Sequence, residues 1–168
     1  MTQVYIAAGG NIEPVASLSQ ALALLRATWP DIRCSRAYQN AAAGFEGDDF
    51  INLAAGFTTN LSLAQVLARL HDIERACGRE RDVPKWAPRS MDLDVLLFGT
   101  LVGEYPGAVL PRPDLLKRAY MLGPLAEIAG DLRHPVTGLS IAEHWRRFDR
   151  AAHPLHPVDV PGLDSAGC

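Results

Sequence analysis

The sequence predicts an α+β domain with a ferredoxin-like βαββαβ core, extended to a three-layer α/β/α single domain. Apolar or alternating segments and longer helical patterns follow one another in the order strand, helix, strand, strand, helix, strand. That order is the split βαβ arrangement, in which an antiparallel sheet carries both long helices on one face. Two later helical segments could cover the other face.

The first half of the core has clear boundary signals. Residues 4–8 form a short apolar run that ends at a Gly-Gly-Asn turn, and they are predicted to be the first strand. A helix is predicted from Pro14, which suits a first helical turn, to about Trp29, where Pro30 ends it. Residues 32–38 are predicted to be the second strand.

The second half repeats this logic. Residues 50–59 are predicted to be the third strand, and their alternation should direct one set towards the helices: Ile51, Leu53, Ala55 and Phe57. Ser62 and Gln65 form a capping box that starts a helix, which ends at Gly78. Residues 92–98 are the fourth strand.

The rest of the chain should complete the domain. Residues 120–128 and 141–148 have helical patterns. The domain is therefore assigned to residues 1–148. Residues 149–168 are rich in proline and glycine and poor in apolar side chains, so they are expected to form a loosely ordered tail.

Composition limits the class of protein. A chain of 168 residues that is 48% hydrophobic can bury one core, and its net charge of −3 argues against broad nucleic-acid binding. It contains no apolar stretch of the roughly 20 residues needed to cross a bilayer, and no basic leader segment. Its cysteines, Cys34, Cys77 and Cys168, are odd in number and far apart, which predicts neither a disulfide framework nor a zinc site. A reducing cytoplasm is the expected location.

Two carboxylates begin the fourth strand. Asp92 and Asp94 should share one face, with Cα atoms roughly 6.5–7 Å apart. Paired carboxylates repel each other unless a cation lies between them, and oxygen ligands at this spacing suit Mg²⁺. The alternative is a strand edge kept soluble by charge.

A basic segment precedes this strand. Its cations are Arg79, Arg81, Lys85 and Arg89, and it contains Trp86 between two prolines. Cations beside a metal site indicate a nucleotide's phosphates. Because prolines restrict the backbone and no apolar period places the tryptophan in a core, a hinged lid is predicted, with a solvated loop as the alternative.

Three further side chains are candidates for ligand contacts. Phe50 and Asn52 should lie on the face opposite the long helices, where they could stack on and hydrogen-bond to a flat heterocycle. Packing of Phe50 under the covering helices is the alternative. Glu74 could contact a nucleotide, or form an exposed ion pair with Arg75 or Arg79.

Four segments together are similar to one enzyme family. They are the Tyr-Ile-Ala-Ala-Gly-Gly-Asn start, Asp-Phe-Ile-Asn at residues 49–52, Ile73-Glu74 through Gly78-Arg79, and Trp-Ala-Pro-Arg-Ser-Met-Asp-Leu-Asp at residues 86–94. The pattern resembles 6-hydroxymethyl-7,8-dihydropterin pyrophosphokinase (2-amino-4-hydroxy-6-hydroxymethyldihydropteridine diphosphokinase) of folate biosynthesis, over about residues 4–135. The family's ferredoxin-like α/β/α fold agrees with the order of elements.

The resemblance implies an ATP diphosphotransferase. It would transfer the β,γ-diphosphate of ATP to the pterin's hydroxymethyl oxygen and release AMP, with two Mg²⁺ ions bound by Asp92 and Asp94. Arg81 and Arg89 complete the implied catalytic residues. The implied pterin-binding residues are Gly9, Ala43, Phe50, Asn52, Trp86 and Tyr120. The implied ATP-binding residues are Glu74, Arg79, Lys85, Arg89, Arg112 and Arg118.

The chain departs from the family pattern at three places. Asn-Ala-Ala-Ala-Gly at residues 40–44 replaces the usual Thr-Pro before a glycine, Arg112 replaces the histidine of Leu-Pro-His, and Lys85 stands where arginine is common. Arg112 keeps a cation that does not titrate near neutrality, and Lys85 keeps charge without bidentate geometry.

These departures leave other functions open. They are a divergent relative acting on a modified pterin or related alcohol, and a non-catalytic ligand-binding member of the family. A ferredoxin-like RNA-binding module is disfavoured, because the central strands lack its aromatic stacking motif. The expected partners are ATP and a dihydropterin, without nucleic acid or membrane, and the chain is expected to be a monomer.

Overall fold

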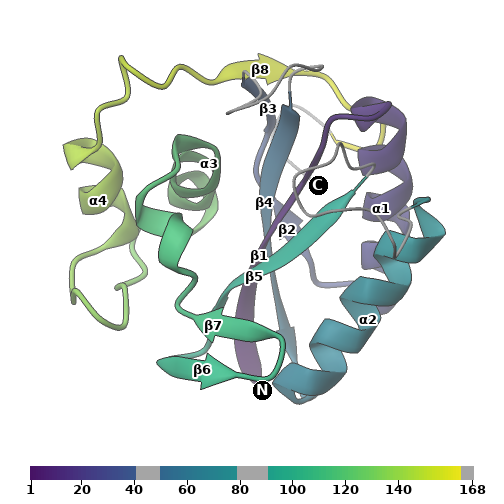
Figure 1. Cartoon of the computed structure of the whole chain (residues 1–168), viewed down its shortest axis with the longest axis horizontal. Helices are drawn as coiled ribbons and strands as arrows, with labels where there is room; N and C mark the ends of the chain where they lie inside the picture. Colours follow the sequence, from purple (N-terminus) through teal and green to yellow (C-terminus); the bar gives the residue numbers. More distant parts are fainter. Residues whose placement is uncertain (41–49, 79–90, 164–168) are drawn as a thin grey trace.

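The computed structural model describes residues 1–40, 50–78 and 91–163. A central six-stranded sheet lies between two helical layers, with α1 and α2 on one side and α3 and α4 on the other (Figure 1). The sheet strands are β1 (Thr2–Gly10), β2 (Arg33–Cys34), β3 (Ala37–Asn40), β4 (Phe50–Thr59), β5 (Asp92–Phe98) and β8 (His156–Val158). The helices are α1 (Pro14–Thr28), α2 (Leu63–Ala76), α3 (Ala119–Ala129), α4 (Ile141–Arg147) and the 3₁₀ turn η1 (Pro113–Leu116).

The strand order confirms the predicted fold class. The sheet runs β5-β1-β4-β3-β8, and each of these neighbouring pairs is antiparallel. Counted along the predicted core, this is fourth, first, third and second strand, which is the order expected of a split βαβ fold. β1 therefore lies between β4 and β5 and pairs with both.

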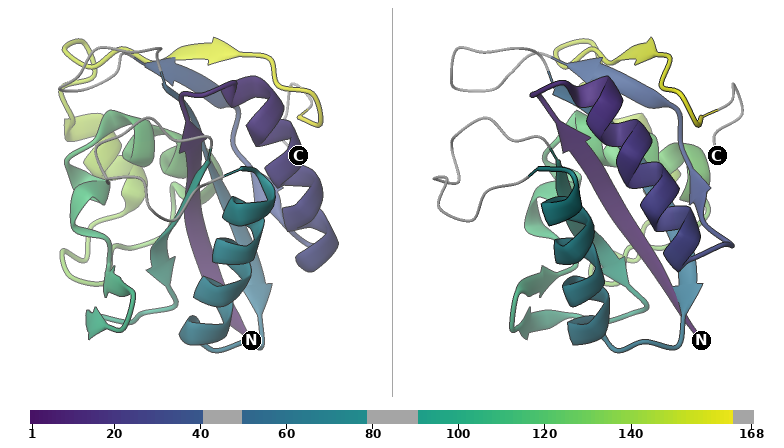
Figure 2. Two further views of the ribbon diagram at one scale, coloured as in Figure 1. Left: turned by 45° about the vertical axis from the view of Figure 1, so that its right-hand side comes forward. Right: turned by 90° about the vertical axis from the view of Figure 1, so that its right-hand side faces the viewer.

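The two long helices cover one face of the sheet, as predicted (Figure 2). The predicted inward set of β4 lies in the core on this side, together with buried side chains of both helices. The start and end signals also hold: Pro14 begins α1, the Ser62–Gln65 capping box begins α2, and Gly78 follows α2 with a φ of 91°.

The second predicted strand is interrupted. Cys34 and Tyr38 are four residues apart, whereas their partners on β4, Ala55 and Asn52, are three apart, so β2 and β3 are separated by a one-residue bulge. At this bulge the Ser35 hydroxyl oxygen accepts a hydrogen bond from the Ala54 backbone N–H at 2.9 Å. A side-chain oxygen thus replaces a strand carbonyl.

The other face of the sheet is covered by α3 and α4. A second core forms here from Ala7, Ala54 and residues of β5, α3 and α4. The helices lie close to the predicted residues 120–128 and 141–148. Helices on both faces complete the three-layer arrangement that the sequence predicted.

The last part of the chain differs from the loosely ordered tail expected from its composition. β8 pairs with β3, and Val160 is 2% exposed in the core beside α1 and α2. Strand pairing uses backbone groups, so it does not require an apolar sequence, and one valine is enough to close the remaining gap in the core.

A hairpin and the cysteines also differ from expectation. β6 (Gly103–Tyr105) and β7 (Ala108–Leu110) form a two-stranded sheet that was not predicted. The sequence predicted no disulfide framework, but Cys34 is disulfide-bonded. Cys77 is a free buried thiol, and burial raises its pKa. Within the described ranges, no helix is both long and apolar enough to span a membrane.

Candidate active site

A polar cavity of about 310 Å³ lies between the α3 face of the sheet and the segment that carries η1 and the start of α3. Eight of the predicted site residues line it: Gly9, Phe50, Asn52, Asp92, Asp94, Arg112, Arg118 and Tyr120. Four residues that the sequence did not single out also line it: Ala7, Asn40, Asp114 and Met121. A larger hollow of about 740 Å³, between α3, α4 and residues 150–155, contains none of the predicted residues.

Strand register places the polar groups of the sheet at two ends of this cavity. Gly9 on β1 pairs with Asn52 on β4 and with Asp92 on β5. Directly paired residues point to the same face of a sheet, so the side chains of Asn52 and Asp92 lie on one face. They are two strands apart, about 10 Å, and only Gly9 lies between them. In the next row, Ala7 separates Ala54 from Asp94. The small residues leave open space between an amide end and a carboxylate end.

The amide end is tightly packed. Asn52 is 7% exposed, and its Nδ2 donates a hydrogen bond to Asn40 Oδ1 at 2.8 Å. Its Oδ1 lies only 1.9 Å from the position that a Cβ atom on Gly9 would occupy. Glycine is therefore required at this position if Asn52 is to keep its place.

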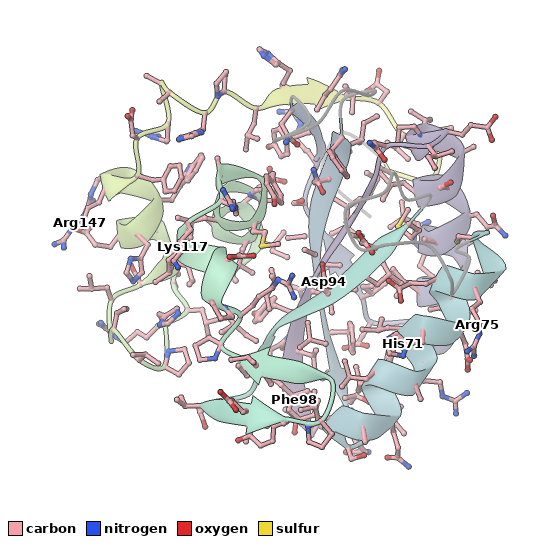
Figure 3. The ribbon with its side chains drawn as sticks, viewed as in Figure 1. His71, Arg75, Asp94, Phe98, Lys117 and Arg147 are labelled. Atoms are coloured by element: carbon pink, nitrogen blue, oxygen red, sulfur yellow. The ribbon has the colours of Figure 1, made fainter. Side chains whose placement is uncertain are left out.

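The carboxylate end combines acids with a cation. Asp94 lies on β5 near the middle of the molecule (Figure 3). Its Oδ1 is 3.5 Å from Arg112 Nη1, and both side chains are about one-third exposed, at 35% and 33%. The Arg112 backbone N–H donates to Leu96 O at 2.9 Å, which attaches the segment before η1 to the same strand.

The donors at this end fit Mg²⁺. Asp92 and Asp94 share the cavity face of β5, as predicted. No cluster of three or more metal-binding side chains occurs in the part of the chain that the structure describes. Mg²⁺ is commonly bound by one or two carboxylates and completed by water and substrate phosphates, so two aspartates beside open space are a suitable set.

The wall opposite the sheet supplies cations and an aromatic ring. Arg118 is the residue before the first turn of α3, and Tyr120 lies in that turn. Burial raises the pKa of the Tyr120 phenol, and the Arg118 guanidinium partly offsets this rise. Tyr120 is therefore a neutral ring at pH 7, available for stacking or hydrogen bonding.

Glu74, a predicted ATP contact, does not line this cavity. It is 3% exposed on α2, and its Oε2 accepts a hydrogen bond from the Leu93 backbone N–H at 2.9 Å. The alternative of a solvent-exposed ion pair was therefore wrong. Leu93 lies between the two aspartates on β5, so this bond holds that part of β5 from the side facing α2.

We expect Glu74→Ala to lower the free energy of unfolding by about 1–3 kcal/mol, because the buried Leu93 N–H loses its acceptor. Glu74→Gln keeps an acceptor and should lose less. Denaturant unfolding of both variants measures the difference. If instead both variants unfold like the unsubstituted protein but bind ATP more weakly, Glu74 acts on the nucleotide and not on the strand.

Six predicted site residues lie outside the described residues. They are Ala43, Arg79, Arg81, Lys85, Trp86 and Arg89.

Comparisons with known proteins find one enzyme family. Residues 5–130 match the family model for 7,8-dihydro-6-hydroxymethylpterin-pyrophosphokinase (HPPK). The chain is 36% identical to the 2-amino-4-hydroxy-6-hydroxymethyldihydropteridine pyrophosphokinase of Synechocystis sp. over 163 residues, 95% of this chain and 81% of that protein. It is 34% identical over 128 residues, 76% of this chain, to the folic acid synthesis protein fol1 of Pneumocystis carinii.

The fold also matches that of a solved structure. A solved HPPK-DHPS in complex with substrates superposes with a TM-score of 0.69 at 12% identity, over 90% of this chain. The chain spans 44% of that solved chain and 17% of the Pneumocystis protein. It therefore corresponds to one part of those longer proteins.

Proposed function

Because the chain belongs to the 7,8-dihydro-6-hydroxymethylpterin-pyrophosphokinase family, we propose that it transfers the β,γ-diphosphate of ATP to 6-hydroxymethyl-7,8-dihydropterin in folate biosynthesis. The observation that carries the proposal is that the amide end and the carboxylate end, about 10 Å apart, belong to the same cavity. A pterin bound at the first end can direct its hydroxymethyl group towards a polyphosphate bound at the second.

The amide end holds the ring. Asn52 pairs with the polar edge of the pterin, and Phe50 and Tyr120 stack on its faces. Gly9 and Ala7 leave the hydroxymethyl group unobstructed along the sheet. Holding both reactants in one geometry lowers the entropic part of the barrier.

The carboxylate end holds the phosphates. Arg112 and Arg118 supply positive charge beside the transferred group. The hydroxymethyl oxygen forms a bond to the β-phosphorus, the bond from that phosphorus to the α-phosphate oxygen breaks, AMP leaves and the hydroxyl proton is released. Mg²⁺ bound by Asp92 and Asp94, two ions in this proposal, would neutralise polyphosphate charge.

The remaining residues, except Glu74, keep their proposed roles. Arg81 and Arg89 act on the transition state, Ala43 and Trp86 contact the pterin, and Arg79 and Lys85 contact ATP. Glu74 supports the site indirectly, through its bond to the Leu93 N–H between the two aspartates. The protein acts as a cytoplasmic monomer. Family membership and the cationic segment at residues 79–89 support these roles.

An assay with ATP, Mg²⁺ and 6-hydroxymethyl-7,8-dihydropterin tests the function. We expect AMP and the pterin diphosphate in equal amounts, and no AMP when the pterin is omitted. Chromatography separates AMP from ADP. ADP as the product would identify transfer of one phosphate, and no turnover would indicate a non-catalytic member or a different alcohol substrate.

A further inference from the structure

Asn40 is the last residue of β3 and pairs with Phe50 across the strands. Its side chain reaches diagonally to Asn52, which donates Nδ2–H to Asn40 Oδ1 at 2.8 Å. Both residues line the polar cavity. From the sequence alone Asn40 has no assigned role and is only part of a departure from the family's Thr-Pro.

We propose that Asn40 is a positioning residue that fixes the direction of the Asn52 amide and thereby selects the ring that the cavity binds. The proposal rests on the proposed function and deepens it. An asparagine amide is a donor on one side and an acceptor on the other, and a half-turn about its last bond exchanges them. The Asn40 Oδ1 acceptor, at 2.8 Å, favours the orientation in which Asn52 Nδ2 faces it.

Gly9 makes room for this orientation on the other side. Asn52 Oδ1 fills the space above Gly9 that a Cβ atom would occupy. With one N–H bound to Asn40, the amide offers the ligand its Oδ1 and its second N–H in a fixed order. Both are held in a site where Asn52 is almost fully buried.

This fixed order matches the ring named in the relatives. A 2-amino-4-oxo ring presents an N3–H donor beside an O4 acceptor, which pair with an amide oxygen and an amide N–H. A 2,4-diamino ring presents an N3 acceptor beside a 4-amino donor, so its order is reversed. With the Asn52 amide fixed, binding of the diamino ring would leave buried polar groups unpaired. Sites that hydrogen-bond their ligand reject such an analogue strongly.

The test compares two rings in calorimetric titrations of the full chain with Mg²⁺ and a non-hydrolysable ATP analogue. The probes are 6-hydroxymethylpterin and 2,4-diamino-6-hydroxymethylpteridine. The unsubstituted protein should prefer the 4-oxo ring. Asn40→Ala should lower this preference at least tenfold, because the amide becomes free to turn. Asn40→Asp, which keeps an acceptor, should retain the preference.

Two controls separate selection from simple support of the strand. Gln39→Ala alters the neighbouring residue of β3 and should leave the preference unchanged. Asn40→Val, which likewise has no side-chain acceptor, replaces the alanine variant if the latter does not fold. If Asn40→Ala weakens the binding of both rings equally, or leaves the preference unchanged, the proposal about Asn40 is overturned. AMP production by the unsubstituted protein would still support the proposed function. If that protein bound neither ring, both proposals would be overturned.

Discussion

Replacing Asp94 with asparagine is expected to lower AMP production more than about 10²-fold at saturating Mg²⁺, and Asp92→Asn should have a similar effect. Each change keeps the shape of the side chain but removes a charged oxygen ligand from the carboxylate end of the cavity. Polyphosphate charge would then be poorly neutralised. Initial rates of AMP formation for each purified variant measure the loss.

The fold should survive these substitutions. The contact of Asp94 with Arg112 at 3.5 Å is partly exposed, so little folding free energy depends on the Asp94 charge. The melting temperature should stay close to that of the unsubstituted protein. Asp131→Asn makes the same chemical change at an exposed position after α3 and should leave the rate unchanged. Near-normal AMP formation by folded Asp94→Asn would remove Asp94 from the metal site.

Gly9→Ala is expected to weaken pterin binding by about 1–3 kcal/mol, roughly 5- to 150-fold. The added Cβ would lie 1.9 Å from Asn52 Oδ1, and Asn52 is itself bound to Asn40, so the amide must leave its place. ATP affinity measured without pterin should change much less, because Gly9 lies at the amide end. Calorimetric titration with each ligand gives both values.

A double-mutant cycle separates this collision from general distortion of β1. Asn52→Ala alone should also weaken pterin binding by about 1–3 kcal/mol, since polar atoms of the ring lose their partner. Adding Gly9→Ala to Asn52→Ala should then cost little, because the colliding group is gone. The same cost of Gly9→Ala in both backgrounds would show that its effect does not pass through Asn52.

The parts of the fold that the sequence predicted are those with strong local signals. Helix ends at Pro14, Ser62 and Gly78 depend on neighbouring residues alone, and the alternation in β4 identifies its buried face from one strand. Strand order then followed from the sequence of elements. These features need no knowledge of distant contacts.

The parts that the sequence did not predict depend on distant partners. The bulge at Ser35 exists because Ala54 on another strand donates to its hydroxyl, and β8 exists because β3 offers an open edge. The β6–β7 hairpin is an exception, since Pro106-Gly107 is a recognisable turn sequence, and Gly107 has a φ of 86°.

The candidate site divides in the same way. The pair Asp92 and Asp94 and the face of Phe50 and Asn52 followed from strand parity, and the structure brings them into one cavity. Asn40 could not be identified, because it contacts Asn52 diagonally across two strands. The buried bond of Glu74 likewise joins an α2 side chain to a distant strand backbone.

The bulge at Ser35 also allows the length of this chain to vary. Cys34 and Tyr38 pair with β4 residues that are only three apart, so removal of the extra residue between them would give a regular strand without changing these pairs. Directly paired residues share a face, so Tyr38 and Asn40 would keep the face of Asn52 and Phe50. The bond from the Ala54 N–H to the Ser35 hydroxyl would be lost. Relatives that share this site can therefore have a spacing one residue shorter here without a compensating change elsewhere in the same strand.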